Sequence, residues 1–126
     1  MSEKIRILVT DDHIVVRKGL VAMLETEPEI QIVGEASNGA EAVKMAQELL
    51  PDVVLMDLVM PVMDGIEAIQ RIRKTHSKET LPILLFTADS SEEETNTEVF
   101  ADINGIIAKP VIYEKLVDTL GRVIKR

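Results

Sequence analysis

Residues 53–57 have the sequence Val-Val-Leu-Met-Asp, a run of four apolar residues that ends in a carboxylate. The apolar residues do not alternate with polar ones, which is typical of a strand buried on both faces of a parallel sheet. Four similar runs, rich in Val, Ile and Leu, occur at residues 5–9, 30–33, 83–86 and 106–108. The sequence therefore predicts five buried strands.

The segments between these runs have the spacing of amphipathic helices. Val16, Leu20, Met23 and Leu24 lie at positions i, i+4, i+7 and i+8, on one face of a helix. Similar spacing recurs in three more segments: Val43, Ala46 and Leu50 before Pro51; Ile66, Ile69 and Ile72; and Ile112, Leu116, Leu120 and Val123. The alternation predicts an α/β fold, a doubly wound five-stranded parallel sheet of strand order 2-1-3-4-5 with helices on both faces.

The segment after the fourth predicted strand has a weaker helical pattern. Ser91 and Glu94 resemble a capping box, but residues 90–98 contain no apolar side chain. Because helices in proteins are stabilised mainly by packing of an apolar face, we expect residues 91–100 to form a weakly anchored helix.

Composition restricts the possible classes of function. The 126 residues are 46% hydrophobic and 29% charged, which is ordinary for one folded domain. The absence of cysteine excludes disulfides, thiolate catalysis and cysteine-ligated metals. A net charge of −8 disfavours direct contact with nucleic acid. Since no membrane span or signal peptide is recognisable, we expect a single cytoplasmic domain over residues 1–126, without membrane contact.

Four of the five predicted strands end in residues suited to the same chemistry. The first ends at Asp11 and Asp12, the third at Asp57, the fourth at Thr87 and the fifth at Lys109. With the strand order 2-1-3-4-5, these residues converge at the carboxyl edge, where doubly wound sheets bind ligands. The sequence thus predicts an acidic cluster flanked by a hydroxyl and an ammonium group.

Such a cluster needs a positive partner. Two carboxylates about 4 Å apart repel by roughly 4 kcal/mol at an effective dielectric of 20, so either a proton or a cation must join three of them. Oxygen ligands select a hard ion such as Mg²⁺. The ammonium and hydroxyl groups complete a pocket for a phosphoryl group, which a carboxylate could accept as an aspartyl phosphate.

Each of these residues also has a purely structural interpretation. Asp12 would cap the first helix, Thr87 would be an ordinary strand-end residue, and Lys109 would be a solvated charge. His13, in the first helical turn, is expected at the surface rather than as a ligand, because hard cations prefer oxygen; His76 is expected to be solvated. The occurrence of suitable residues at four strand ends favours the functional interpretation.

The same residues lie in motifs that resemble a known family. The stretches are Ile7-Leu8-Val9-Thr10-Asp11-Asp12, Asp57-Leu58-Val59-Met60-Pro61 with Asp64-Gly65, Phe86-Thr87-Ala88, and Lys109-Pro110. Together they resemble, over essentially the whole chain, the CheY-like receiver domain of two-component response regulators. The stretch Asp11-Asp12-His13 with Val16-Arg17, and the sequence Val-Gly-Glu-Ala-Ser-Asn-Gly at 33–39, are similar to receivers of NarL/LuxR-type transcription regulators in particular.

The resemblance implies a phosphoacceptor and a metal site. Asp57 would accept a phosphoryl group from a sensor histidine kinase. Mg²⁺ would be bound directly by Asp12, Asp57 and the backbone carbonyl of Val59, and through water by Asp11.

The resemblance also implies how the signal leaves the site. Thr87 and Lys109 would contact the phosphoryl oxygens, and Pro110 would follow a cis peptide bond. The face formed by the fourth helix, fifth strand and fifth helix would then shift. The chain departs from the family at Ile106, where an aromatic switch residue is usual, and at Val111, where Phe is common. Val59 and Asp89 occupy the variable positions that are thought to set the phosphoryl lifetime.

Alternative functions remain open at this stage. A receiver of this subgroup would control a C-terminal DNA-binding domain, which these residues do not include, so DNA would be contacted only through that domain. A stand-alone receiver acting by protein contacts is the alternative; either form could dimerise on phosphorylation. We expect no enzyme activity beyond phosphorylation and dephosphorylation of Asp57. A Mg²⁺-dependent aspartyl phosphatase would have Asp-x-Asp after its first strand, and an unphosphorylated scaffold would not need the full set of strand-end residues.

Overall fold

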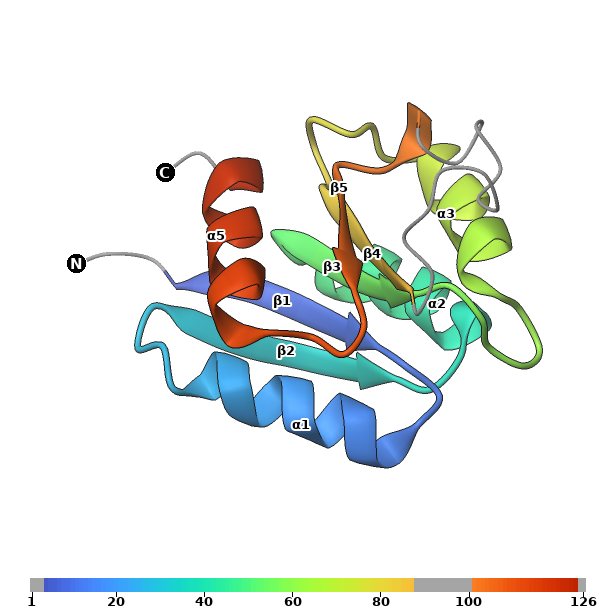
Figure 1. Ribbon diagram of the computed structural model, residues 1–126. Helices are drawn as coiled ribbons and strands as arrows, with labels where there is room; N and C mark the ends of the chain where they lie inside the picture. The colour runs from blue at the N-terminus through green and yellow to red at the C-terminus, as the bar shows by residue number, and fades with distance from the viewer. Residues whose placement is uncertain (1–3, 88–100, 125–126) are drawn as a thin grey trace.

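The computed structural model describes residues 4–87 and 101–124. Its strands form one parallel sheet of order β2-β1-β3-β4-β5, as the sequence predicts (Figure 1). The predicted helix at residues 91–100 and the variable position Asp89 lie outside the described residues. The elements in chain order are β1 (Ile5–Thr10), α1 (Ile14–Glu25), β2 (Ile30–Ala36), α2 (Gly39–Leu49), β3 (Val53–Asp57), α3 (Gly65–Arg73), β4 (Ile83–Thr87), β5 (Gly105–Ala108) and α5 (Tyr113–Val123).

The two strands with continuous apolar runs, β3 and β4, lie in the interior of the sheet. Every residue of β3 and of β4 is buried. The flanking strand β1 is buried in its last four residues, and the edge strands β2 and β5 are only partly buried. The absence of alternation in the sequence therefore marks strands that are covered on both faces, as in other parallel sheets.

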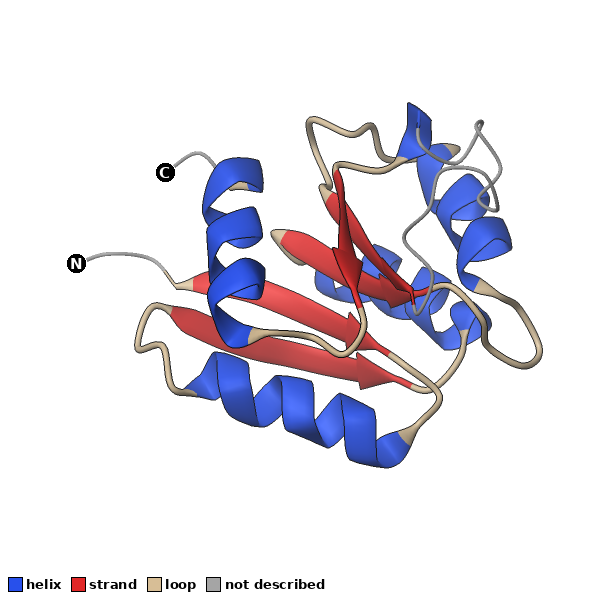
Figure 2. Ribbon diagram, viewed as in Figure 1, coloured by secondary structure: helices blue, strands red, loops and turns tan. Residues whose placement is uncertain are grey.

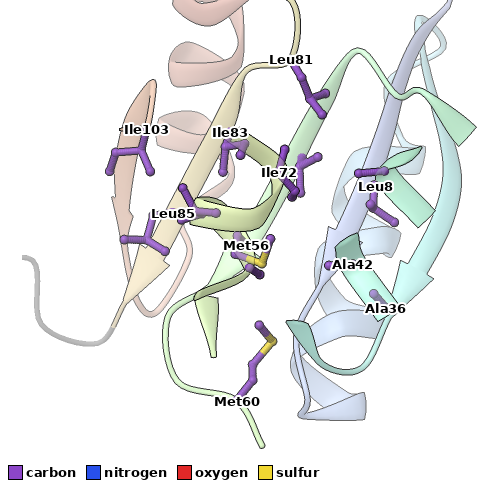
Figure 3. Packing of buried hydrophobic residues seen from close by; sticks show 14 residues of the cluster. Leu8, Ala36, Ala42, Met56, Met60, Ile72, Leu81, Ile83, Leu85 and Ile103 are labelled. Atoms are coloured by element: carbon purple, nitrogen blue, oxygen red, sulfur yellow. The ribbon is translucent and has the colours of Figure 1, made fainter. Parts of the chain in front are cut away.

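Helices cover both faces of the sheet, α1 and α5 on one face and α2 and α3 on the other (Figure 2). Each face has its own aliphatic core. The core under α1 and α5 includes Leu24, Leu55 and Leu116. Figure 3 shows the core under α2 and α3, in which Ala42 and Ile72 meet side chains of the central strands such as Met56.

Three apolar residues of the predicted helix faces are exposed: Val16, Leu50 and Ile112, of which Ile112 is 51% exposed at the N-cap of α5. Val16 is 37% exposed, and Val21 takes its place in the core beside Leu20 and Leu24. Leu50 is 59% exposed, because α2 ends at Leu49 and Leu50 turns into the left-handed conformation at φ 48° and ψ 61°. Proline disfavours the α conformation in the residue before it. Pro51 therefore makes α2 end at Leu49, one residue before the last apolar position of the helical spacing, Leu50.

A polar network at the amino edge of the sheet holds β5 in place. The Arg73 guanidinium donates hydrogen bonds to the carbonyls of Leu81 (2.8 Å) and Asp102 (2.7 Å) and to Asn104 Oδ1 (3.2 Å). Asn104 Oδ1 also accepts a hydrogen bond from the Ile83 amide, at 3.0 Å. The end of α3 is thus joined to the starts of β4 and β5, which fixes where β5 delivers its carboxyl end.

Within residues 4–87 and 101–124, no helix has the length and apolar character that crossing a bilayer requires.

Candidate functional site

The site lies where the strands end, at the carboxyl edge of the sheet. Asp57 is the last residue of β3. Backbone hydrogen bonds continue for one residue beyond the ends of β1 and β5. The Asp11 amide donates to the Ala36 carbonyl (3.1 Å), and the Lys109 amide donates to the Thr87 carbonyl (2.9 Å). These bonds fix the backbone from which each side chain of the predicted site projects.

Lys109 lies between two of the carboxylates. Its Nζ is 2.9 Å from Asp57 Oδ1 and 3.5 Å from Asp11 Oδ2, and it lies over the Phe86 ring at 5.5 Å from the centroid. The side chain of Lys109 is only 22% exposed. The interpretation of Lys109 as a solvated charge is therefore wrong, because two carboxylates and an aromatic ring hold its long side chain in one place. The Lys109–Pro110 peptide bond is cis, as the resemblance implies.

The electrostatic environment disfavours a negative charge on Asp57. Burial raises the pKa of Asp57, and the neighbouring charges of Asp11 and Asp12 raise it further, against the opposing effect of Lys109. Burial by itself would lower the pKa of Lys109, but the hydrogen bond and charge of Asp57, with a smaller contribution from Asp11, raise it above its ordinary value. Lys109 is thus a firmly held ammonium ion in a pocket that has an excess of negative charge.

Replacing Asp57 by asparagine should therefore stabilise the metal-free protein at pH 7, by on the order of 1 kcal/mol. A carboxyl whose folded pKa is raised binds its proton more tightly when folded, so its contribution to stability falls as pH rises above the ordinary carboxyl pKa. Urea unfolding with a chelator at pH 7 and near pH 4 measures this. The gain in unfolding free energy from Asp57→Asn should shrink at the lower pH. A variant less stable than wild type at pH 7 would contradict the conclusion that the negative charge of Asp57 is unfavourable in the folded protein.

Asp11 and Asp12 bring further carboxylate oxygens to the same place. One ligand atom from each of Asp11, Asp12, His13 and Asp57 lies within 4.8 Å of the others. Asp11 Oδ2 and Asp12 Oδ1 are buried and have no hydrogen-bond partner among the described residues. Buried oxygens without a hydrogen bond are costly unless a positive group joins them, and the Lys109 ammonium, 3.5 Å from Asp11 Oδ2, reaches only one of these two oxygens. The donor set therefore fits a hard divalent cation such as Mg²⁺, which takes one or two carboxylates and completes its shell with water.

The alternative interpretation, in which Asp12 caps the first helix, is wrong. The N-cap of α1 is His13, which makes no capping hydrogen bond through its side chain. Asp11 Oδ1 instead accepts a hydrogen bond from the His13 amide, at 2.8 Å. Both aspartates are thus available to the site, and His13 is exposed, as predicted.

The loop after Asp57 is held by two close backbone approaches. The Gly65 amide donates to the Leu58 carbonyl at 2.9 Å, and a Cβ added at Gly65 would lie 2.3 Å from the Asp57 carbonyl oxygen. The Gly39 amide donates to the Met63 carbonyl at 2.8 Å, and a Cβ there would lie 2.3 Å from that oxygen. Only glycine fits at either position, so these two residues define the backbone on which Asp57 is displayed.

The remaining predicted residues lie around this cluster. Thr87 ends β4 and is 5% exposed. Val59 lies in the loop after β3, with a side chain that is 74% exposed. At the positions where the chain departs from the family pattern, Ile106 packs against the core under α2 and α3, and Val111 against the core under α1 and α5.

Sequence reasoning missed the role of Glu35. Its carboxylate pairs with Arg17 (3.1 Å) and Lys18 (3.0 Å) of α1, and Arg17 also donates a hydrogen bond to the Asp11 carbonyl, at 2.7 Å. Burial would raise the pKa of Glu35, but these two cations outweigh it and lower the pKa. Glu35 thus helps to hold α1 beside the strand that carries Asp11. A carboxylate and a cation 18 residues apart in sequence give no periodic signal of such a pair.

A family described as the response regulator receiver domain matches residues 7–121. The chain belongs to this family. Curated relatives include the transcriptional regulatory proteins YdfI, 38% identical over 120 residues, and LiaR, 50% identical over 88 residues, both from Bacillus subtilis. These matches cover 95% and 70% of the chain, but only 55% and 42% of the two relatives, so the chain spans about half the length of the curated relatives it matches.

Solved structures agree with this assignment. The signal receiver domain of the response regulator NarL from Mycobacterium tuberculosis superimposes with a TM-score of 0.86 at 31% identity, over 99% of this chain and 100% of that one. The receiver fold, the resemblance to response regulators and the similarity to NarL/LuxR-type receivers are thereby confirmed. Receiver domains of regulators such as LiaR act in signalling, and response regulators generally interact with histidine kinases.

Proposed function

We propose that the chain is a phosphorylation-dependent switch in which Asp57 accepts a phosphoryl group from a sensor histidine kinase. The observation that carries the proposal is the placement of Asp57: its buried carboxylate ends a central strand, 2.9 Å from the Lys109 ammonium and beside Asp11 and Asp12. A carboxylate oxygen forms the new P–O bond while the P–N bond to the donor histidine breaks, and the leaving imidazole takes up a proton.

Asp11, Asp12, Asp57 and the Val59 carbonyl would hold Mg²⁺. The support is chemical: the donors are oxygens, and two of them are buried without a hydrogen-bond donor among the described residues. A bound divalent cation neutralises charge that builds up on the phosphoryl oxygens. Lys109 contributes a second positive group whose position does not depend on the metal, because Phe86 and the Thr87 carbonyl also hold this residue.

Phosphorylation changes the charge to which Lys109 and Thr87 respond. The site gains a group of about −2 charge with three acceptor oxygens where a single carboxylate stood. Lys109 would pair with these oxygens and Thr87 would donate its hydroxyl. Both residues end strands, so their movement is passed to the segments that follow β4 and β5. We propose that the face containing β5 and α5, together with the helix expected at residues 91–100, carries the output. Ile106 replaces the aromatic relay and makes a rotating ring unavailable on β5.

The similarity to NarL/LuxR-type regulators suggests what this receiver controls. YdfI and LiaR are named transcriptional regulatory proteins and are matched over only about half of their length. We therefore propose that residues 1–126 form one receiver domain that controls a DNA-binding domain, with dimerisation on phosphorylation. DNA would then be contacted only outside this domain, in keeping with its net charge of −8.

Acetyl phosphate provides a direct test. Wild type and Asp57→Asn are incubated with the donor and Mg²⁺, and the intact mass is measured. Wild type should gain one phosphoryl group, and should lose this gain when a chelator replaces Mg²⁺; Asp57→Asn should gain none. Asp52→Asn, the other aspartate of the β3 region, is the matched control and should behave as wild type. Equal labelling of wild type and Asp57→Asn would overturn the proposal.

A further inference from the structure

His13 is the one nitrogen donor within the cluster of ligand atoms that the described residues form at this edge of the sheet. Its Nδ1 lies 3.2 Å from Asp12 Oδ1 and 3.4 Å from Asp11 Oδ1. The Asp11 carboxylate also accepts the His13 backbone amide, at 2.8 Å. The ring is thus tethered to the cluster by its own backbone while 67% of its side chain remains exposed.

These distances match the spacing of neighbouring ligands around one ion. Two donors that each lie about 2.1 Å from an octahedral cation, at right angles, are separated by about 3 Å. Nδ1 and Asp12 Oδ1 have nearly this separation already. Because 67% of the His13 side chain is exposed, its ring can turn without displacing core residues.

A second observation points to a ligand at this place. Asp11 is fully buried, and neither its Oδ2 nor Asp12 Oδ1 accepts a hydrogen bond from the described residues; the Lys109 ammonium lies 3.5 Å from Asp11 Oδ2. One ligand atom from each of Asp11, Asp12 and His13 lies within 4.8 Å of the others. A cation bound between them satisfies all three donors at once, whereas a water molecule in the same place supplies only two protons.

We propose that His13 is an additional ligand of the divalent-cation site, and that its Nδ1 gives the site selectivity for first-row transition ions such as Mn²⁺, Co²⁺ and Ni²⁺ over Mg²⁺. Imidazole suits these ions, whereas Mg²⁺ prefers oxygen and keeps its water. The proposal rests on the proposed function in that both use the carboxylates of Asp11, Asp12 and Asp57. It adds that the side chain at position 13 determines which divalent ion this receiver binds.

Electron spin echo spectroscopy with Mn²⁺ tests the ligand directly, since it detects nitrogen bound to the ion without any phosphodonor. Mn²⁺ bound to wild type should show ¹⁴N modulation from one imidazole. His13→Ala should bind Mn²⁺ without this modulation. His76→Ala is the matched control, because His76 is the other histidine of the chain, and it should retain the modulation.

Calorimetric titration with Ni²⁺ and with Mg²⁺ gives the selectivity. His13→Ala should weaken Ni²⁺ binding by at least about tenfold and change Mg²⁺ binding by less than about twofold. The exposed position of His13 makes misfolding of this variant unexpected, and circular dichroism checks it.

Each adverse outcome has a distinct meaning. Mn²⁺ binding by wild type without ¹⁴N modulation, or equal losses of Ni²⁺ and Mg²⁺ affinity in His13→Ala, would overturn the role of His13 and leave the proposed function standing. Failure of wild type and of Asp57→Asn alike to bind any of these ions would overturn both, because the carboxylate site itself would then be absent.

Discussion

Replacing Lys109 by methionine should destabilise the metal-free protein by about 2 kcal/mol and at the same time tighten its binding of Mg²⁺. Lys109 Nζ lies 2.9 Å from Asp57 and 3.5 Å from Asp11. Removing one partner of a buried ion pair costs about 3–5 kcal/mol, and the 22% exposure of the Lys109 side chain reduces this figure through solvent screening.

The two effects have one electrostatic cause. Without the ammonium group, the carboxylates of Asp11, Asp12 and Asp57 repel one another with less compensation, so the folded state loses free energy. The same excess charge attracts a divalent cation more strongly. Mg²⁺ should therefore restore part of the lost stability, although the phosphoryl-dependent response should be lost because the cationic partner of the new phosphoryl group is missing.

Urea unfolding with a chelator and with Mg²⁺, together with calorimetric titration of Mg²⁺, measures both effects. Lys115→Met is the matched control, because Lys115 is an exposed lysine on α5; it should leave the stability and the Mg²⁺ affinity nearly unchanged. If Lys109→Met bound Mg²⁺ no more tightly than wild type, Lys109 would not be balancing the charge of the metal-binding carboxylates.

Replacing Gly65 by alanine should destabilise the protein by about 2–3 kcal/mol and weaken its response to Mg²⁺ and phosphodonor. The added methyl group would lie 2.3 Å from the Asp57 carbonyl oxygen and 3.1 Å from Leu58 Cα. Both neighbours are backbone atoms, so relief requires a shift of the chain at Asp57 itself, and overpacking of this kind costs about 1–3 kcal/mol. The Asp57 carboxylate would then move away from its partners.

A second glycine separates this steric effect from the general effect of glycine in helices. Gly121 lies inside α5, and nothing lies within 4 Å of a Cβ added there. Gly121→Ala should therefore stabilise the protein by about 0.5–1 kcal/mol, because alanine loses less conformational entropy in a helix. Thermal unfolding of both variants tests the contrast. A Gly65→Ala protein as stable as Gly121→Ala would show that the backbone around Asp57 is not constrained as described.

The fold could be predicted from the sequence because its strongest signals are local. The runs that form β3 and β4 are apolar throughout, and every residue in them is buried. The error at Leu50 arose because a periodic spacing does not show where the helix ends, and a proline one residue later moved that end. The Arg73 network could not be predicted, since its partners are mostly backbone carbonyls, which exist at every residue.

The composition of the site could be predicted, but not its geometry. Residues at the ends of neighbouring parallel strands must meet at one edge, so the convergence of Asp11, Asp57 and Lys109 follows from topology alone. The alternative in which Asp12 caps α1 has the same sequence signature as a ligand, and only the position of the helix start at Ile14 decides between them. The approach of His13 to the carboxylates depends on one side-chain rotation, which no sequence pattern specifies.

A crystal structure with Mn²⁺ and beryllofluoride tests the central claim most directly. We predict an anomalous peak for Mn²⁺ between the carboxylates of Asp12 and Asp57, a beryllofluoride group bonded to an Asp57 oxygen, and the Lys109 ammonium in contact with its fluorides. A fluoride adduct on another residue, or an ion bound elsewhere while the Asp57–Lys109 pair stays intact, would contradict the account.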